Sequence, residues 1–513
     1  MTKKVKRVAK KESGLATIGL VIEQLRKDRG MTQADFAKAV GTSQSAVARI
    51  EKGEQNLSIE MFSKMSAALQ RDIVNVSRGA INVEVTGGTP LSGRITVKTS
   101  KNGAMGLLAA SLLNRGRTLL KNVPRIEEVQ RMIEVFESIG IVVRWVGSDL
   151  EIKPPKKIAI EKIDKAAAER TRSIVMLIGP LIHHFEKFSV PQAGGCKLGS
   201  RTVKPHVYAL ENFGVNIHTT HDAYEVSHKK LRPREIVLYE SGDTVTENAV
   251  IAAAGIPGTT IIKYASANYM GQEVCFYLQK LGVKIEGIGT TTITVHGRAD
   301  INTDVEYFLS EDPIEAMFFL AVAVVTKSRI TIERCPIDFL ELELLRLEKM
   351  GFKYKILRRY KALNGETNLV DIETMPSKLV ALEEKIESRP YPGLNIDNLP
   401  FFAVIATQAA GTTFIHDWVY EKRAIHYKEL DKLGADTLLA DPHRIYITGP
   451  TKLRPAEVIC PPALRPAAII LIGMLAAEGT SVLRNIYSIN RGYEDIVKRL
   501  ASIGANVKIL RDL

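Results

Sequence analysis

Between residues 81 and 513, an amphipathic stretch ends six times in an apolar residue followed by glycine, and a strand-like run comes next. The first copy reads FESIGIVV and the last reads LASIGANV. Each glycine suits the left-handed residue that closes a helix. The spacings of 68 to 83 residues are too long for a solenoid repeat. The pattern predicts six similar units, each with two helices and several strands, marked by Gly140, Gly214, Gly282, Gly351, Gly434 and Gly504.

Three further stretches, LLAASLL, AVIAAA and AAIILIGMLAA, are apolar nearly all round. A helix without a polar face is typical of a buried position. Gly-Thr strand openings occur at residues 258, 411 and 479, in several cases after such a helix. The sequence therefore predicts helices inside and strands outside. Three units in each of two domains would leave a cleft between the domains that suits a substrate.

Residues 15–70 have a different, wholly helical pattern. Apolar residues recur at helical spacing in LATIGLVIEQL. Thr32, and then Thr42 or Ser43, suit the N-caps of two short helices. Gly41 suits the left-handed residue between them. Two short helices joined by a tight glycine turn predict a helix-turn-helix.

The stretch MTQADFAKAVGTSQSAVARIEKG closely resembles the Cro/repressor-like family. By that resemblance the second helix enters the major groove of DNA, where Gln44, Ser45 and Arg49 face bases and Gln33 contacts a phosphate. The basic tail, residues 1–14, would add an attraction to phosphates that fades with salt. A helical dimerisation or protein-contact module with a solvated basic tail stays open as the alternative.

Composition is that of an average globular protein, with 45% apolar and 25% charged residues. The formal net charge of +13 favours a polyanionic partner or an anionic substrate. The four cysteines lie far apart, which argues against a disulfide framework and a zinc site. No apolar run reaches the ~18 residues of a membrane span, and the basic start lacks the apolar core of a secretory signal. We therefore expect a cytoplasmic protein that works without a metal or cofactor.

One cysteine lies in a basic, glycine-rich segment, PQAGGCKLGSR. Glycines allow such a loop to fold over a ligand. Lys197 and Arg201 are placed to favour a reactive thiolate at Cys196. The alternative, a buried packing thiol, needs neither the glycines nor the charges.

Together, the sixfold repeat and the AGGCKLGSR loop resemble the enolpyruvyl transferase family. The resemblance implies an α/β fold of two domains, each with three βαβαββ repeats around buried helices (an inside-out α/β barrel). The all-α helix-turn-helix domain precedes it. The chain is expected to start in domain I, cross to domain II near Lys101 and return near Asp312. The predicted boundaries are 1–14 for the basic tail, 15–72 for the helix-turn-helix domain, 73–80 for a linker, 81–101 with 307–513 for domain I, and 102–306 for domain II.

Within this family, the cysteine loop is typical of the branch that transfers the enolpyruvyl group of phosphoenolpyruvate to the 3-hydroxyl of UDP-N-acetylglucosamine. That reaction releases phosphate and is the first committed step of peptidoglycan synthesis. A small, highly charged anion such as phosphoenolpyruvate needs several fixed cations. The resemblance implies the substrate-binding residues Lys101 and Asn102 in SKNGA, Arg172, Arg201, Lys204, Arg423, Arg465 and Arg491.

The resemblance also assigns the proton transfers that the reaction requires. Asp397, in PYPGLNIDN, matches an aspartate near the sugar hydroxyl, although an isolated aspartate in a loop is usually a turn former. Cys196 would act as an acid near C3 of phosphoenolpyruvate or in product release. Lys101 would bind the phosphate.

Several positions depart from the family pattern, among them Ala193, which stands for a proline of the cysteine loop. Ala463 stands where the family has an aspartate, two residues before Arg465. Lys204 reverses a charge in the segment that contacts uridine, although lysine can still bind a diphosphate. Glu240 stands where a lysine is expected near the diphosphate. Two readings stay open: a divergent but working enzyme, or a paralogue that has a different acceptor or has become a DNA-binding regulator sensing a cell-wall precursor.

Overall fold

The computed structural model describes residues 19, 22, 23, 26, 27, 31–55, 61, 64, 65, 68, 81–192 and 202–511. The chain divides into an N-terminal unit, Met1–Ile81 with Arg511–Leu513, and a main body, Asn82–Leu510. The predicted tail and linker, together with Cys196 and Arg201, lie outside the described residues. The domain boundaries given above stay predictions.

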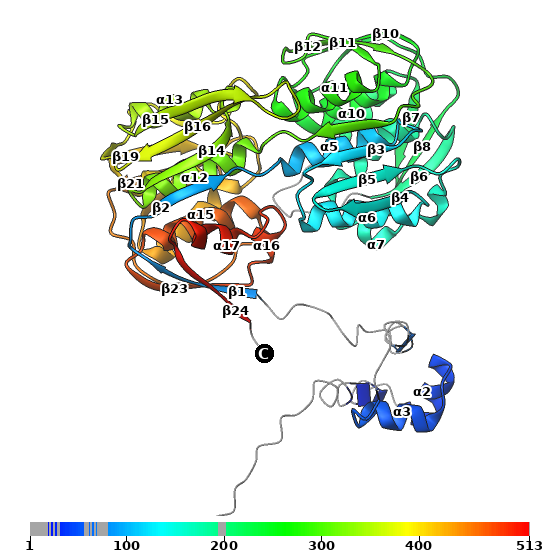
Figure 1. The fold of residues 1–513 in the computed structure, drawn as a ribbon, viewed down its shortest axis with the longest axis horizontal. Coiled ribbons are helices and arrows are strands. Elements are labelled where there is room, and N and C mark those ends of the chain that lie inside the picture. Colours follow the sequence, from blue (N-terminus) through cyan, green and yellow to red (C-terminus); the bar gives the residue numbers. More distant parts are fainter. Residues whose placement is uncertain are drawn as a thin grey trace, which may run out of the picture. The chain divides into compact units, whose positions relative to one another are not determined.

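The N-terminal unit contains the two short helices expected from the sequence, α2 (Gln33–Val40) and α3 (Gln44–Glu51) (Figure 1). The side chains of Thr32 and Ser43 cap them, and Gly41 between them has a φ of 70°. The predicted caps and turn are therefore confirmed. The apolar faces of the helices pack into a small core of Ile22, Phe36, Ala37, Val40, Val47, Ile50 and Met65.

The described strands of the main body form six sheets, three in each of two lobes (Figure 1). Lobe II, on the right, contains the sheets β13-β3-β5-β4, β6-β8-β7 and β11-β12-β10-β9. Its strands are β3 (Thr118–Lys121), β4 (Val142–Val146), β5 (Asp149–Lys153), β6 (Lys187–Pro191), β7 (Val215–Thr219), β8 (Ala223–His228), β9 (Glu235–Val237), β10 (Gly258–Lys263), β11 (Lys284–Glu286), β12 (Thr292–Gly297) and β13 (Val305–Phe308). Its helices are α5 (Lys101–Ser111), α6 (Glu127–Ser138), η1 (Ile160–Lys162), α7 (Lys165–Ala168), η2 (Arg172–Leu177), α8 (Ile178–Leu181), α9 (Lys204–Glu211), α10 (Asp243–Ala254) and α11 (Tyr269–Lys280).

Lobe I, on the left, contains the sheets β22-β23-β1-β24, β15-β16-β14-β2 and β17-β19-β21-β20, the last with β18 also paired to β19. Its strands are β1 (Ile81–Gly87), β2 (Ser92–Thr96), β14 (Arg329–Pro336), β15 (Lys353–Lys361), β16 (Asn368–Met375), β17 (Leu379–Val380), β18 (Ile386–Glu387), β19 (Ala409–His416), β20 (Asp436–Asp441), β21 (Arg444–Gly449), β22 (Glu457–Ile459), β23 (Gly479–Arg484) and β24 (Asn506–Arg511). Its helices are α12 (Pro313–Val325), η3 (Ile337–Phe339), α13 (Glu341–Lys349), α14 (Leu399–Ala406), η4 (Arg423–Leu433), α15 (Leu464–Ala476), α16 (Tyr487–Asn490) and α17 (Ile496–Ser502).

The six sheets correspond to the six predicted repeats. Each repeat glycine is followed by a strand of a different sheet, namely β4, β7, β11, β15, β20 and β24. All six glycines have positive φ, between 83° and 97°. The left-handed helix ends that the repeat pattern predicted are therefore confirmed.

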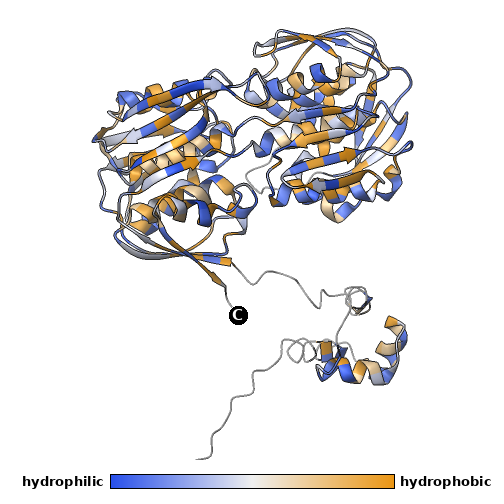
Figure 2. Ribbon diagram, in the orientation of Figure 1, coloured by the Kyte–Doolittle hydropathy of each residue, from blue (hydrophilic) through white to orange (hydrophobic). Residues whose placement is uncertain are grey.

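The apolar helices lie inside, as their lack of a polar face predicted. Every residue of α12 is buried, and so is α10 from Val245 to Ala254. Figure 2 shows the hydrophobic residues along the helix at the centre of lobe I. None of the helices in the described part of the chain is long and apolar enough to cross a membrane.

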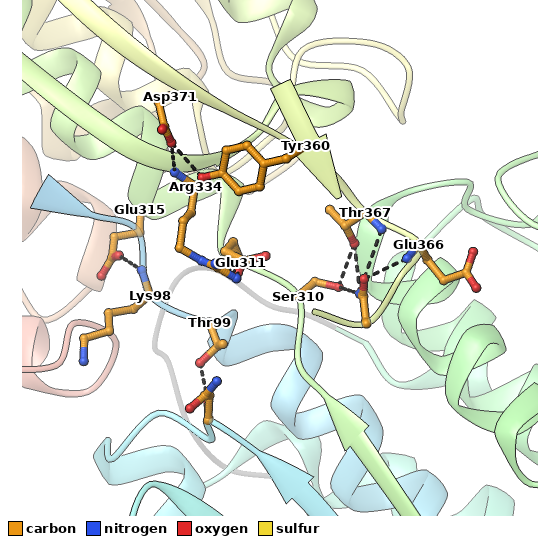
Figure 3. Close-up of polar contacts among 12 residues, drawn as sticks. Lys98, Thr99, Ser310, Glu311, Glu315, Arg334, Tyr360, Glu366, Thr367 and Asp371 are labelled. Atoms are coloured by element: carbon orange, nitrogen blue, oxygen red, sulfur yellow. Dashed lines mark hydrogen bonds and ion pairs between the residues drawn. The ribbon is translucent and has the colours of Figure 1, made fainter. Parts of the chain in front are cut away.

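The chain passes between the lobes along two segments that lie side by side (Figure 3). The backbone N–H of Ser100 donates to the carbonyl of Ser310 at 2.8 Å, and Thr99 pairs with Glu311. The Nε of Arg334 donates to Glu311 at 2.8 Å. Helices α5 and α12 begin directly after these segments, so the first turns of both helices lie at the junction of the lobes.

Candidate functional site

Lys101 and Arg491 contact the same carboxylate from different lobes. Lys101 is the first residue of α5, after its N-cap Ser100, and its Nζ lies 2.5 Å from Oε2 of Glu128. Arg491 follows α16, and its Nη2 donates to Oε1 of Glu128 at 2.6 Å. Burial raises the pKa of Glu128, but the charges and hydrogen bonds of the two cations outweigh burial and lower it. The two cations together form the kind of site that a phosphate or carboxylate ligand requires.

Sequence reasoning missed Glu128. It lies in the first turn of α6, where acidic residues are common because they balance the helix dipole. Its partners are 27 and 363 residues away in the chain. No local signal could therefore have distinguished it from an ordinary helix-start glutamate.

Asp397 lies between two of the predicted arginines of lobe I. Its Oδ2 is 3.4 Å from Nη2 of Arg465, and its Oδ1 is 3.8 Å from Nη1 of Arg423. Nη1 of Arg465 also donates to the hydroxyl of Tyr493 at 3.0 Å. Burial lowers the pKa of Arg465, but Tyr493 and the carboxylate of Asp397 outweigh burial and raise it. The predicted base and two predicted cations thus lie together.

A buried carboxylate fixes the orientation of Arg423. Its Nε and Nη2 donate to Asp417 at 2.5 and 2.9 Å, and the side chains of Arg423 and Asp417 are 1% and 0% exposed. The hydroxyl of Tyr427 donates to the same carboxylate. The carbonyl of Ile396 accepts from Arg423 at 2.7 Å. Sequence reasoning did not single out Asp417, although it determines how Arg423 presents Nη1 to Asp397.

Asn102 contacts a neighbouring helix within lobe II. Its side-chain amide donates to the hydroxyl of Tyr269, in α11, at 3.2 Å. Burial first, and then the charge of Asp312, raises the pKa of Tyr269, and Asp397 contributes to the rise. Asn102 and Tyr269 thus form a polar pair where α5 and α11 begin.

Arg172, the first residue of η2, reaches the start of α9, where Lys204 lies. Nη2 of Arg172 donates to the carbonyl of Thr202 at 3.3 Å, and Lys204 is the exposed first residue of the helix. Burial raises the pKa of Glu240, and the positive charge of Arg172 opposes that rise. Arg172 therefore lies near two of the segments in which this chain departs from the family pattern, those of Lys204 and Glu240.

Three of the four cysteines are unsuited to nucleophilic or acid chemistry. Cys275, Cys335 and Cys460 are buried and free. Burial raises the pKa of Cys275 and of Cys460 to about 12, and it raises that of Cys335 as well. Such thiols are inert at neutral pH. Cys196, like Arg201, lies outside the described residues.

Ala463 is the N-cap residue of α15 and provides no side-chain cap. An aspartate in this position would accept hydrogen bonds from the first backbone N–H groups of the helix. The helix that carries Arg465 in its first turn therefore begins without the carboxylate expected from the family pattern.

In the N-terminal unit, Gln44, Ser45 and Arg49 are exposed on α3, while the opposite face of the helix is buried. Gln33, the predicted phosphate contact, donates from Nε2 to Oε2 of Glu51 at 2.8 Å. The three residues predicted to face bases are thus accessible. The hydrogen bond from Gln33 to Glu51 also links α2 to α3.

Two known families match the chain. Residues 85–500 match EPSP synthase (3-phosphoshikimate 1-carboxyvinyltransferase), and residues 22–75 match the helix-turn-helix family. The UDP-N-acetylglucosamine 1-carboxyvinyltransferase of Treponema denticola is 34% identical over 429 residues, covering 83% of this chain and 98% of that protein. The enzyme of the same name from Bradyrhizobium diazoefficiens is 32% identical over 431 residues, covering 83% of this chain and 97% of that protein.

Two solved structures share the fold of the main body. The enolpyruvyl transferase NikO from Streptomyces tendae superposes with a TM-score of 0.72 at 22% identity, over 85% of this chain and 100% of that one. EPSP synthase from Acinetobacter baumannii superposes with a TM-score of 0.67 at 17% identity, over 84% and 100%.

Proposed function

The chain belongs to the EPSP synthase family of carboxyvinyltransferases, and we propose that it transfers the enolpyruvyl group of phosphoenolpyruvate to the 3-hydroxyl of UDP-N-acetylglucosamine, releasing phosphate. The two-domain enolpyruvyl transferase fold implied by the family resemblance is confirmed. The identity of the acceptor is supported by the curated UDP-N-acetylglucosamine enzymes, which align over nearly their whole length. The observation that carries the proposal is the convergence of Lys101 and Arg491, from two lobes, on one carboxylate.

Four cations with defined positions are assigned to phosphoenolpyruvate. Lys101 binds the phosphate as a compact point charge, while the guanidinium groups can bind the phosphate or the carboxylate through two parallel hydrogen bonds. Because Lys101 and Arg491 already share Glu128, an incoming anion competes with that carboxylate for them. The assigned residues are Lys101, Arg423, Arg465 and Arg491, with Arg201 joining them from the cysteine loop.

The proton transfers are assigned to Asp397 and Cys196. Asp397 accepts the proton of the 3-hydroxyl as the hydroxyl oxygen bonds to C2 of phosphoenolpyruvate, and Cys196 donates a proton to C3. The bond between C2 and the phosphate oxygen then breaks, phosphate leaves, and C3 returns a proton to the Cys196 thiolate, which restores the double bond. Closure of the lobes would exclude water during these steps.

Three residues of lobe II are assigned to the acceptor. Asn102 contacts the sugar nucleotide, and Arg172 and Lys204 provide positive charge for its diphosphate. This assignment is supported by the position of Arg172 beside the segment that leads into Lys204. We place the reaction in the cytoplasm, as the first committed step of peptidoglycan synthesis.

The test is phosphate release from phosphoenolpyruvate by the purified protein, with and without UDP-N-acetylglucosamine. We expect release that requires the UDP-sugar and is lost in Cys196→Ala and in Lys101→Ala. Release with shikimate 3-phosphate instead would assign the chain to the other branch of the family. Absence of turnover, with DNA binding that depends on the UDP-sugar, would contradict the proposal and favour a sensor.

For the N-terminal unit we propose DNA binding through Gln44, Ser45 and Arg49, supported by their exposure on α3 and by the helix-turn-helix match. A side chain that reads a base edge typically contributes about 1–3 kcal/mol of discrimination. Arg49→Ala should therefore reduce the preference for the selected DNA sequence over random DNA, as measured by competition binding. An unchanged preference would argue for the protein-contact alternative.

A further inference from the structure

The excess positive charge of the chain is concentrated in two places. Residues 1–80 hold 15 Lys and Arg against 8 Asp and Glu, and residues 81–513 hold 55 against 49. Within the second part, residues 346–361 alone hold seven Lys and Arg against one Glu. The excess of this short segment equals the whole excess of residues 81–513, so the rest of that part is balanced.

The basic segment forms the end of α13 and the strand β15, at the edge of lobe I (Figure 1). In the sheet order β15-β16-β14-β2 of the described strands, β16 is the single neighbour of β15. The strand reads KYKILRRYK and contains no acidic residue. It therefore presents a long basic edge to solvent.

Besides Lys361, which donates to the backbone carbonyl of Glu366, three exposed cations of this strand have no ion-pair partner among the described residues. No carboxylate among the described residues lies within 4.0 Å of the charged nitrogens of Lys353, Lys355 or Arg359. Glu373 faces Lys355 in the register without forming such a pair. These three positive charges are consequently available to a partner.

Aromatic rings alternate with the cations. The half-buried ring of Tyr354 stacks on the buried ring of Phe352, with centroids 5.9 Å apart. The guanidinium of Arg358 lies 4.4 Å from the ring of Tyr360, while its Nε pairs with Asp371 at 2.8 Å. Interleaved cations and aromatic rings are typical of surfaces that contact nucleic acids, because cations neutralise phosphates and rings stack with bases.

Lysines on an exposed edge strand can also prevent two chains from pairing edge to edge. That role does not account for a segment that holds all the excess charge of residues 81–513, in a chain whose other basic region is a helix-turn-helix. We propose that β15 and the end of α13 form a second DNA contact, which binds the phosphate backbone without sequence preference. This role is independent of the transferase activity.

The salt dependence of DNA affinity tests the proposal. Fluorescence anisotropy of the full chain with a labelled duplex of arbitrary sequence gives the slope of log affinity against log salt between about 50 and 200 mM NaCl. Each neutralised phosphate contributes about 0.9 to that slope, so the triple variant Lys353→Gln, Lys355→Gln, Arg359→Gln should reduce its magnitude by about 2–3.

A matched control removes three exposed cations from lobe II, in the variant Lys229→Gln, Lys230→Gln, Arg232→Gln. Residues 225–240 around them hold four cations against three acids, so this surface is nearly neutral. We expect an unchanged slope. Thermal unfolding should be the same in both variants and the wild type, because these side chains are exposed.

Three results would overturn the proposal. One is an unchanged slope in the β15 variant, which would mean that β15 does not contact DNA. An equal reduction of the slope in both variants would likewise contradict the proposal, because it would indicate diffuse electrostatic attraction. The third is self-association of the β15 variant with an unchanged slope, which would show that the lysines only protect the edge. The variant Arg49→Ala separates the two DNA contacts, since it should lose sequence preference and keep the contribution of β15.

Discussion

At the scale of single residues, the site is an arrangement of charges that hold one another in place. Arg423 shows this most clearly, because Asp417 binds two of its nitrogens and leaves the third near Asp397. The family resemblance was enough to predict Arg423. It could not indicate which carboxylate would balance the buried charge, since Asp417 is one of many aspartates in the chain.

Removing the charge of Asp417 should destabilise the protein strongly. Asp417→Asn leaves the buried guanidinium of Arg423 without a counter-charge, and breaking a buried pair in this way typically costs about 3–5 kcal/mol. Urea denaturation measures the loss in the free energy of unfolding. Glu457→Gln is the control, because its partner Arg484 is exposed and such pairs contribute about 0–1 kcal/mol. A similar loss in both variants would refute this account of Asp417.

Glu273, in α11, gives a prediction about pH. Burial raises its pKa to about 8, although the backbone N–H of Ser310 donates to it at 2.6 Å. The folded state therefore binds more protons than the unfolded state between about pH 4.5 and 8, and this group's contribution to stability falls as pH rises through that window.

Glu273→Gln keeps an acceptor for Ser310 but cannot ionise. The free energy of unfolding of the variant, relative to the wild type, should therefore increase from about pH 5 to about pH 8. Urea denaturation at both pH values measures this difference. If it stays constant, Glu273 has no raised pKa in the folded protein.

At the scale of elements, each of the six repeats has a helix that ends at a glycine with positive φ. Gly504 and Gly351 have similar φ values of 90° and 97°, but their surroundings differ. A Cβ at Gly504 would lie 4.0 Å from its nearest neighbour, the backbone nitrogen of Ser92. A Cβ at Gly351 would lie 2.8 Å from the carbonyl oxygen of Lys378. At Gly504, only the positive φ requires glycine. At Gly351, the positive φ and the lack of room for a Cβ both require it.

This difference predicts unequal costs of substitution. Gly504→Ala should lower the free energy of unfolding by about 1–2 kcal/mol, the usual penalty for a left-handed residue with a Cβ. Gly351→Ala should cost more, because the carbonyl of Lys378 is backbone and must shift. Denaturation of the two variants under one condition gives the comparison, and equal losses would contradict it.

At the scale of the whole molecule, the function depends on two lobes that share charges. Glu128 of lobe II neutralises cations from both lobes, Lys101 and Arg491. The same two cations are those assigned to phosphoenolpyruvate. The occupancy of this site therefore depends on a carboxylate that belongs to the protein itself.

Glu128→Gln should strengthen the binding of inorganic phosphate several-fold. The neutral amide no longer offsets the positive charges of Lys101 and Arg491, so both charges can act on the phosphate. Titration calorimetry with inorganic phosphate measures the effect. The neighbouring Glu127, which pairs with Arg131 within the same helix, provides the control variant Glu127→Gln, with no expected change. Weaker phosphate binding in Glu128→Gln would mean that Glu128 orients the cations and does not compete with the ligand.

The sequence by itself determined the features that depend on local geometry. A left-handed residue ends a helix within one turn, so the six glycines marked six repeats that the structure shows as six sheets. The apolar helices were identified as buried for a similar reason, because a helix without a polar face has no solvated side. The caps of the helix-turn-helix act over three residues and were equally predictable.

Only the tertiary structure decided which distant groups meet. β1 pairs with β23, nearly 400 residues later in the chain, and Arg491 reaches Glu128 across 363 residues. Motifs indicated the cations of the site, but the carboxylates that orient them, Glu128 and Asp417, carry no local signal. The pairing of charges depends on distance in space and on burial, and neither is fixed until the lobes have folded and packed.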